Sequence, residues 1–286
     1  MCFKVLASMT SDFESSNNPL GKSSDYPDAY DPSVLYAIER RLGRDGLGLD
    51  SVLPMHGHDY WRAFELSWLD IQGKPQVAMG EFLFDAGSEF IVESKSLKLY
   101  LNSLNQHRFK NEQQVTNLVS SDLSTLLKVS VNFTLKALVA GDLATISTPV
   151  GQCLDHLDIR QPSQGADTSL LTLTGNTVVN QGLYSNLFKS NCPVTGQPDW
   201  ATVYITYSGA EIDRSSLLSY ICSFRSHQGF HEECAERMYC DLLKCCKAEK
   251  LSVALNFLRR GGLDINPCRS THAILPKDFS KRFIRQ

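Results

Sequence analysis

The stretch that decides the fold is ESKSLKLYLNSLNQ, which runs from Glu93 to Gln106. Apolar residues recur in it at the i, i+3, i+4, i+7 spacing of a helix that buries one face. These residues are Leu97, Tyr100, Leu101 and Leu104. Ser94 is predicted to cap the helix, because a serine hydroxyl can accept a hydrogen bond from a free backbone N–H. The stretch therefore predicts a helix after Glu93 whose apolar face packs on another layer.

Strands are predicted on both sides of this helix. Upstream, apolar stretches between Phe64 and Phe84 flank the turn Gln72-Gly73-Lys74-Pro75, a pattern typical of a β-hairpin. Downstream, a second helical pattern precedes a strand in which apolar and polar residues alternate. The helix carries Val115, Leu118, Val119, Leu123 and Leu126, and the strand carries Val129, Val131, Phe133 and Leu135. The predicted order is strand, strand, helix, helix, strand.

The second half of the chain repeats this order at a near-constant offset. Gly73-Lys74-Pro75 precedes Gly196-Gln197-Pro198 by 123 positions, and Phe109 precedes Phe230 by 121. Val131-Asn132-Phe133 precedes Leu255-Asn256-Phe257 by 124 positions. Each match is weak alone, but together they indicate two related modules. The strand of the second module is predicted to open at Gly196.

Runs of strands followed by runs of helices are typical of the α+β class. We therefore predict an α+β protein made of two tandem modules, each an antiparallel sheet with helices packed on one face. An irregular N-terminal arm, rich in Ser, Asn, Asp, Pro and Gly, is assigned to residues 1–33. The first module is assigned to residues 34–160 and the second to residues 161–286.

The composition is that of an ordinary globular protein. Of 286 residues, 42% are hydrophobic and 21% are charged, with a formal net charge of −3. This charge offers no electrostatic attraction to nucleic acid or to an anionic membrane. No apolar run approaches the roughly 20 residues that span a bilayer. Nine cysteines without the spacing of a disulfide scaffold predict reduced thiols and a cytoplasmic protein.

Cys192 is the strongest candidate for a nucleophile. It lies in a loop before a predicted strand, and loops on rigid scaffolds often hold reactive groups. Asp199 follows across a Gly-Pro turn, so the thiol and the carboxyl can meet at one sheet edge. A thiol is mostly protonated at neutral pH and needs activation, while a nearby acid can protonate the group that is attacked. The alternative is a buried, unreactive cysteine beside an aspartate in a turn.

Other segments also carry polar groups. His231-Glu232 opens a predicted helix, where a carboxylate either stabilises the positive helix end or belongs to a site. Arg259-Arg260-Gly261-Gly262 ends a predicted strand and suits a phosphate, although a solvated turn has the same composition. Four cysteines lack the paired CxxC spacing of zinc ligands and are predicted to be core thiols. They are Cys234, Cys240, Cys245 and Cys246.

The two modules differ chemically where their repeats align. Cys192 aligns with Leu69, and Asp199 aligns with Gln76. Conversely, Glu93 of the first module aligns with Arg214 or a nearby serine of the second. Each module therefore carries reactive groups that the other lacks, which favours one composite site where the modules meet. Simple divergence of the two copies explains the same pattern equally well.

Several of these segments resemble those of one known family. The segment ESKSLKLY, residues 93–100, resembles the signature octapeptide of the NADPH-dependent 7-cyano-7-deazaguanine reductases, which act in queuosine biosynthesis for tRNA modification. The segments SNCPVTGQPDW (190–200), FHE (230–232) and RRGGLDINP (259–267) are similar too. The resemblance runs from about Tyr30 to the C-terminus and points to the longer, two-module branch.

The resemblance implies the tunnelling fold, with paired antiparallel sheets and helices outside, and a homodimer. It implies a purine-like substrate, NADPH as co-substrate, no required metal, and no direct contact with nucleic acid or membrane. In the implied mechanism, Cys192 attacks the nitrile carbon to form a covalent thioimidate, and Asp199 supplies a proton to the nitrogen. Two hydrides from NADPH then complete the four-electron reduction to 7-aminomethyl-7-deazaguanine.

The resemblance also implies a role for individual residues. The catalytic group consists of Cys192, Asp199 and His231. The substrate-binding group consists of Val92, Glu93, Ser94, His231 and Glu232, in which the two glutamates hold the polar edge of the base. The NADPH-binding group consists of Ser94, Lys95, Arg260 and Gly261.

Two competing functions come from different classes. A zinc-dependent cyclohydrolase, as in a related tunnelling-fold family, needs His and Cys ligands that converge on one metal. A non-catalytic purine-binding module needs no nucleophile, so it would tolerate replacement of Cys192 by alanine.

Overall fold

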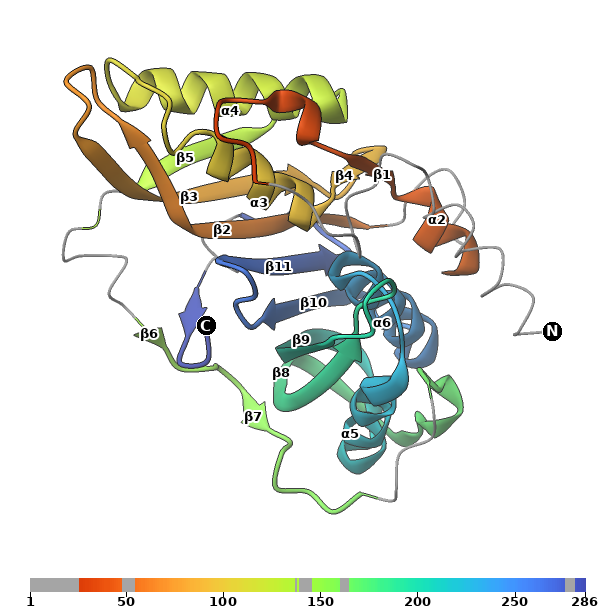
Figure 1. The fold of residues 1–286 in the computed structure, drawn as a ribbon. Helices are drawn as coiled ribbons and strands as arrows, with labels where there is room; N and C mark the ends of the chain where they lie inside the picture. The colour runs from red at the N-terminus through yellow and green to blue at the C-terminus, as the bar shows by residue number, and fades with distance from the viewer. Residues whose placement is uncertain (1–25, 48–54, 137, 139–145, 160–164, 276–280) are drawn as a thin grey trace.

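The computed structural model describes residues 26–47, 55–136, 138, 146–159, 165–275 and 281–286, so most of the predicted N-terminal arm lies outside the described residues. Eight strands form one sheet. In chain order they are β2 (His56–Leu69), β3 (Pro75–Asp85), β5 (Asn132–Lys136), β7 (Gln152–Cys153), β8 (Leu173–Asn191), β9 (Pro198–Ile212), β10 (Lys250–Phe257) and β11 (Leu263–Ser270). Their order across the sheet is β5-β3-β2-β11-β10-β9-β8-β7 (Figure 1).

Short elements complete the fold. Two further strand pairs are β1 (Ala37–Glu39) with β4 (Phe90–Val92), and β6 (Ile146–Ser147) with β12 (Arg282–Phe283). The α-helices are α2 (Arg41–Arg44), α3 (Ser94–Ser103), α4 (Glu112–Leu127), α5 (Arg214–Ser223) and α6 (His231–Cys246). Single 3₁₀ turns are η1 (Pro32–Val34), η2 (Asp45–Leu47), η4 (Thr168–Leu170) and η5 (Phe224–Ser226).

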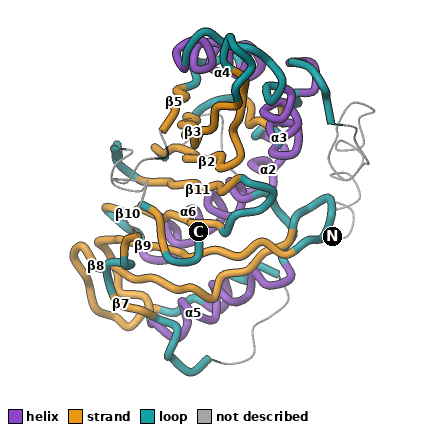
Figure 2. The backbone as a smooth tube through the Cα atoms, turned by 60° about the vertical axis from the view of Figure 1, so that its left-hand side comes forward, coloured by secondary structure: helices purple, strands orange, loops and turns teal. Residues whose placement is uncertain are grey.

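The helices cover one face of the sheet, as the views in Figures 1 and 2 show. Helices α3 and α4 pack on the strands of the first half, and α5 and α6 pack on β8 to β11. Alternate strand residues enter these cores, as expected for a sheet with one covered face. The predicted α+β class, with antiparallel strands and helices on one face, is confirmed, except that the short edge strand β7 pairs with β8 in parallel. Within the described part of the chain, no helix combines the length and apolarity needed to cross a membrane.

The two halves join through β2 and β11, which pair antiparallel from Ala63↔Leu263 to His56↔Ser270. The sheet therefore runs without a break from one half to the other. Gly57 lies in this seam, and a Cβ atom there would sit 2.1 Å from the carbonyl oxygen of Cys268. Only glycine lets the two backbones approach this closely.

The start of α3 differs from the prediction that Ser94 caps it, which was wrong. Glu93 is the N-cap, and Ser94 is the first helical residue. The Glu93 carboxylate accepts hydrogen bonds from Lys95 N at 2.8 Å and from Ser96 N at 2.7 Å. A carboxylate reaches two free amides and interacts favourably with the positive helix end, so it displaces serine from this position.

The strand β8 was not identified from the sequence. Its first half, residues 173–180, is exposed over most of its length and contains Gly175, Asn176 and Asn180. Such residues interrupt the alternation of apolar and polar positions that indicates a strand. Backbone pairing with β9 therefore holds this segment in a strand, although its own residues do not favour one.

A buried network of charges ties the two halves together beneath α6. Arg269 of β11 is fully buried and lies 2.7 Å from Asp59 of β2 and 2.8 Å from Glu236 of α6. Arg40 pairs with Asp59 at 2.6 Å, and Arg44 pairs with Glu236 at 2.7 Å. Each buried charge therefore has an opposite partner, without which its desolvation would oppose folding.

We expect Arg269→Ala to lower the free energy of unfolding by about 3–5 kcal/mol, because it leaves two buried carboxylates without their shared cation. Urea unfolding followed by circular dichroism measures this change. Arg41→Ala is the matched control, since Arg41 pairs with Glu39 at the surface and such pairs contribute little. Equal destabilisation by the two variants would contradict a structural role for the buried network.

Candidate active site

The β8–β9 hairpin brings the predicted nucleophile and the predicted acid to one end of the sheet. Ser190 of β8 pairs with Asp199 of β9. Cys192 N donates to Gln197 O at 2.8 Å, which closes the turn, and Gly196 adopts φ +67° within it. Paired residues of a ladder share a face, so Ser190 and Asp199 point to the side that carries the helices, and Cys192 follows directly after the end of β8. All three are buried.

The first residue of α6 completes this group. His231 Nε2 lies 3.8 Å from Asp199 Oδ1, and its ring packs edge-on against Phe257 at 4.0 Å between centroids. Burial, together with the nearby Arg260 cation, lowers the pKa of His231 to about 3. His231 is therefore a neutral imidazole at physiological pH. Asn191 N donates a hydrogen bond to His227 O, which holds the hairpin end against the loop before α6.

Arg260 is the cation that faces Asp199. Its Nη1 atom lies 3.1 Å from Asp199 Oδ1. Burial raises the pKa of Asp199, and the positive charges of Arg260 and Lys189 oppose that rise. Arg260 N donates to Leu263 O at 2.8 Å, which closes a tight turn between β10 and β11. The structure thus brings Asp199, His231 and Arg260 together from three elements.

The site residues predicted in the first half, Val92, Glu93, Ser94 and Lys95, lie in succession at the junction of β4 and α3. Val92 and Glu93 are buried, whereas Ser94 and Lys95 are half-buried. Burial raises the pKa of Glu93, although its hydrogen bonds to backbone amides oppose the rise. One turn further along α3, Lys98 Nζ lies 3.3 Å from where a Gly261 Cβ would be. This approach connects α3 to the Arg260 turn of the other half.

Glu232 is a buried carboxyl without a complete set of partners. Its Oε1 atom is buried and has no hydrogen-bond partner among the described residues. Burial and the negative charge of Asp59 raise the pKa of Glu232 to about 7, while Arg40 and Arg269 oppose the rise. Such an atom is suited to a ligand that donates a hydrogen bond. The sequence did not predict that Arg40 and Asp59 act on the pKa of Glu232, because both lie more than 170 positions away and form no motif with it.

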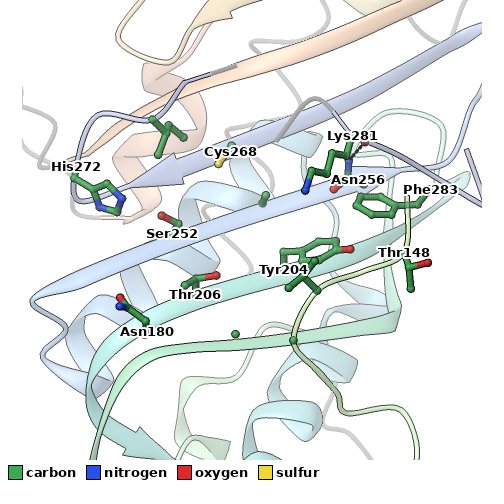
Figure 3. Close-up of a pocket in the computed structure, with 15 residues that line it drawn as sticks. Thr148, Asn180, Tyr204, Thr206, Ser252, Asn256, Cys268, His272, Lys281 and Phe283 are labelled. Atoms are coloured by element: carbon green, nitrogen blue, oxygen red, sulfur yellow. Dashed lines mark hydrogen bonds between the residues drawn. The ribbon is translucent and has the colours of Figure 1, made fainter. Parts of the chain in front are cut away.

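A cavity of about 600 Å³ lies on the opposite, helix-free face of the sheet (Figure 3). Its floor is formed by alternate residues of β9 and β10, including Tyr204, Thr206, Ser252 and Asn256, with Phe283 stacked on Tyr204 at 5.0 Å. The predicted catalytic residues, which the structure describes in full, do not line it. The predicted site and this cavity are therefore separate features on opposite faces.

Two family models match the chain. The model described as nitrile reductase, 7-cyano-7-deazaguanine-reductase N-term, matches residues 26–135, and the model described as QueF-like protein matches residues 198–274. A protein of Desulfotalea psychrophila and one of Bordetella avium are each 48% identical over 89% of this chain and 93% of their own length. A protein of Saccharophagus degradans is 48% identical over 93% of this chain and 98% of its own. All three are named NADPH-dependent 7-cyano-7-deazaguanine reductase.

We expect Glu232→Gln to reduce the dependence of stability on pH, and Glu233, whose pKa burial also raises to about 7, to account for part of what is left. A carboxyl whose pKa is raised from 4.5 to about 7 on folding stabilises the protein fully below pH 4.5, and this contribution is lost as the pH rises through 7. The loss is on the order of 3 kcal/mol, from about 1.4 kcal/mol per unit of pKa. Urea unfolding across this pH window measures it.

Glu112→Gln is the control for this experiment, because Glu112 is an exposed carboxyl in the first turn of α4. It should leave the slope of stability against pH unchanged. An unchanged slope in Glu232→Gln itself would mean that this carboxyl does not cause the pH dependence.

Proposed function

This chain belongs to the family of NADPH-dependent 7-cyano-7-deazaguanine reductases, and from that premise we propose that it reduces the nitrile of 7-cyano-7-deazaguanine to the aminomethyl group of 7-aminomethyl-7-deazaguanine. This step belongs to queuosine biosynthesis. The observation that supports the proposal most is that one end of the β8–β9 hairpin carries both Cys192 and Asp199, with Arg260 beside the carboxyl. A thiol and a proton-transferring group at one hairpin end suit addition to a nitrile.

In the proposed first step, Cys192 Sγ bonds to the nitrile carbon while one π bond of the C≡N group opens. The proton that leaves the sulfur passes through Asp199 to the nitrile nitrogen, which gives a thioimidate with a C=N–H group. Electrons are neither gained nor lost in this step. Covalent capture keeps the partly reduced group in place and converts a poor hydride acceptor into an activated one.

The remaining predicted residues hold the substrate. Glu93 and Glu232 accept hydrogen bonds from the polar edge of the base, and the unsatisfied Oε1 of Glu232 supports this role. Val92 and Ser94 line the same region of the first half. His231 positions the reacting nitrogen and the Asp199 carboxyl, because its neutral ring can donate and accept hydrogen bonds without gaining charge.

The residues around the Arg260 turn fit a phosphate-bearing cofactor. The Arg260 side chain is about one-third exposed (31%), and Gly261, with φ +59°, leaves open backbone beside Lys98. Guanidinium groups and open backbone suit phosphate oxygens. NADPH would be held by Ser94, Lys95, Arg260 and Gly261. When bound, NADPH supplies one hydride in each of two successive rounds of binding, which completes the four-electron reduction.

We also propose a cytoplasmic homodimer. The eight cysteines that the structure describes are free thiols, in keeping with a reducing compartment. The helix-free face of the sheet, with its cavity, offers a surface that a second copy can cover. Light scattering of the purified protein tests this proposal, and a mass of one chain would contradict it.

The first experiment mixes the full-length protein with 7-cyano-7-deazaguanine in the absence of NADPH and records the intact mass. We expect a mass gain equal to that of the substrate, because addition of the thiol to a nitrile loses no atoms. Cys192→Ala should lack this gain and lose turnover by several orders of magnitude, since the nucleophile carries a covalent mechanism.

Cys245→Ala is the matched control, because Cys245 is a half-buried thiol at the far end of α6. It should form the adduct as the unmodified protein does. Unchanged turnover in Cys192→Ala would exclude the covalent route. Tightly bound zinc in one equivalent per chain, lost together with activity, would point instead to a metal-dependent hydrolase.

A further inference from the structure

Arg260 faces two environments at once. Its Nη1 atom lies 3.1 Å from the buried carboxyl of Asp199, whereas 31% of its side chain remains exposed. It is carried by a turn in which Gly261 and Gly262 both adopt positive φ, and this turn packs against Lys98 of α3. The same guanidinium can therefore contact either Asp199 or a ligand that arrives from solvent.

The other groups around Asp199 do not replace this cation. His231 of α6 lies at 3.8 Å but is neutral, because its pKa is lowered to about 3. Lys189 of β8 also lowers the pKa of Asp199, but less than Arg260 does, and its Nζ donates to Asn191 Oδ1 at 2.8 Å and to Arg225 O at 2.7 Å. Cys234 of α6 is a buried thiol whose pKa burial raises, so it contributes no positive charge. Arg260 is therefore the principal counter-charge of the Asp199 carboxylate.

Resting on the proposed function, we propose that Arg260 is a positioning residue that couples cofactor binding to proton transfer. Before the cofactor binds, Arg260 holds Asp199 as a carboxylate that can accept the Cys192 proton. When a cofactor phosphate binds, the guanidinium turns to it, and Asp199 becomes able to hold a proton for the reacting nitrogen. The first state suits thioimidate formation, and the second suits reduction, in which the nitrogen must gain protons.

The coupling has a consequence that does not require turnover. Thioimidate formation needs the Asp199 carboxylate, so its rate falls as the pH drops through the pKa of this group. A nearby cation lowers a carboxyl pKa by about 1 to 3 units. Removing Arg260 should therefore move the midpoint of this fall to higher pH by a similar amount.

The test measures the rate of mass gain with 7-cyano-7-deazaguanine, without NADPH, over the acid to neutral range. We expect the midpoint in Arg260→Gln to lie about 1 to 3 pH units above that of the unmodified protein. Arg260→Lys, which keeps a cation, should lie close to the unmodified protein. Arg259→Gln is the matched control. Arg259 directly precedes Arg260, but its guanidinium carbon lies 3.5 Å from the centre of the Phe64 ring on β2.

A second arm uses the unmodified protein and NADP⁺, which carries the phosphates but no hydride. Saturating NADP⁺ should raise the midpoint toward that of Arg260→Gln and leave Arg260→Gln itself unmoved. The coupling would be overturned if Arg260→Gln formed the adduct with the same midpoint as the unmodified protein and NADP⁺ left the midpoint of the unmodified protein unchanged. The reductase proposal would remain intact in that case. Absence of any adduct in the unmodified protein would overturn the proposed function as well.

Discussion

The antiparallel pairing of β2 with β11 is the constraint on which the rest of the structure depends. It joins two halves that each have a core of their own into one sheet, and it fixes the register between them. A slip of one residue between the two strands would place Arg269 and Asp59 on opposite faces of the sheet, so they could no longer pair. Two features oppose such a slip: Gly57, where the backbones touch, and the buried charges, which find partners in one register only.

This seam also positions elements of the candidate site. Glu236, which pairs with Arg269 and Arg44, stands one helical turn after Glu232 on α6. Residues four apart share a helix face, so the ion pairs that hold α6 against the seam also orient Glu232. The same helix begins with His231, which faces Asp199 on the neighbouring hairpin. Stability and site geometry are therefore coupled through a single helix.

Local signals in the sequence were sufficient for much of this architecture. Helical spacing after Glu93, the hairpin turn at Gly73 and the repeat offset predicted the α+β class, and the short motifs identified Cys192 and Asp199 as candidates. Contacts between distant residues were not predictable in this way. The Arg269 network and the Arg260–Asp199 contact each join residues from separate elements, and no periodicity in a single chain encodes such a pairing. The cap of α3 was assigned to Ser94 instead of Glu93 for a related reason, since capping depends on where the Glu93 carboxylate points and not on the general preference for serine at helix starts.

Burial acts on the site in one consistent direction. It raises the pKa of Asp199 and Glu232 and lowers that of His231, so each group is pushed toward its neutral form. In such surroundings a small number of cations decides which carboxyl keeps its charge. Asp199 faces one of these cations, and that cation is partly exposed. In the proposed mechanism, proton transfer therefore depends less on the acid itself than on where the Arg260 guanidinium lies.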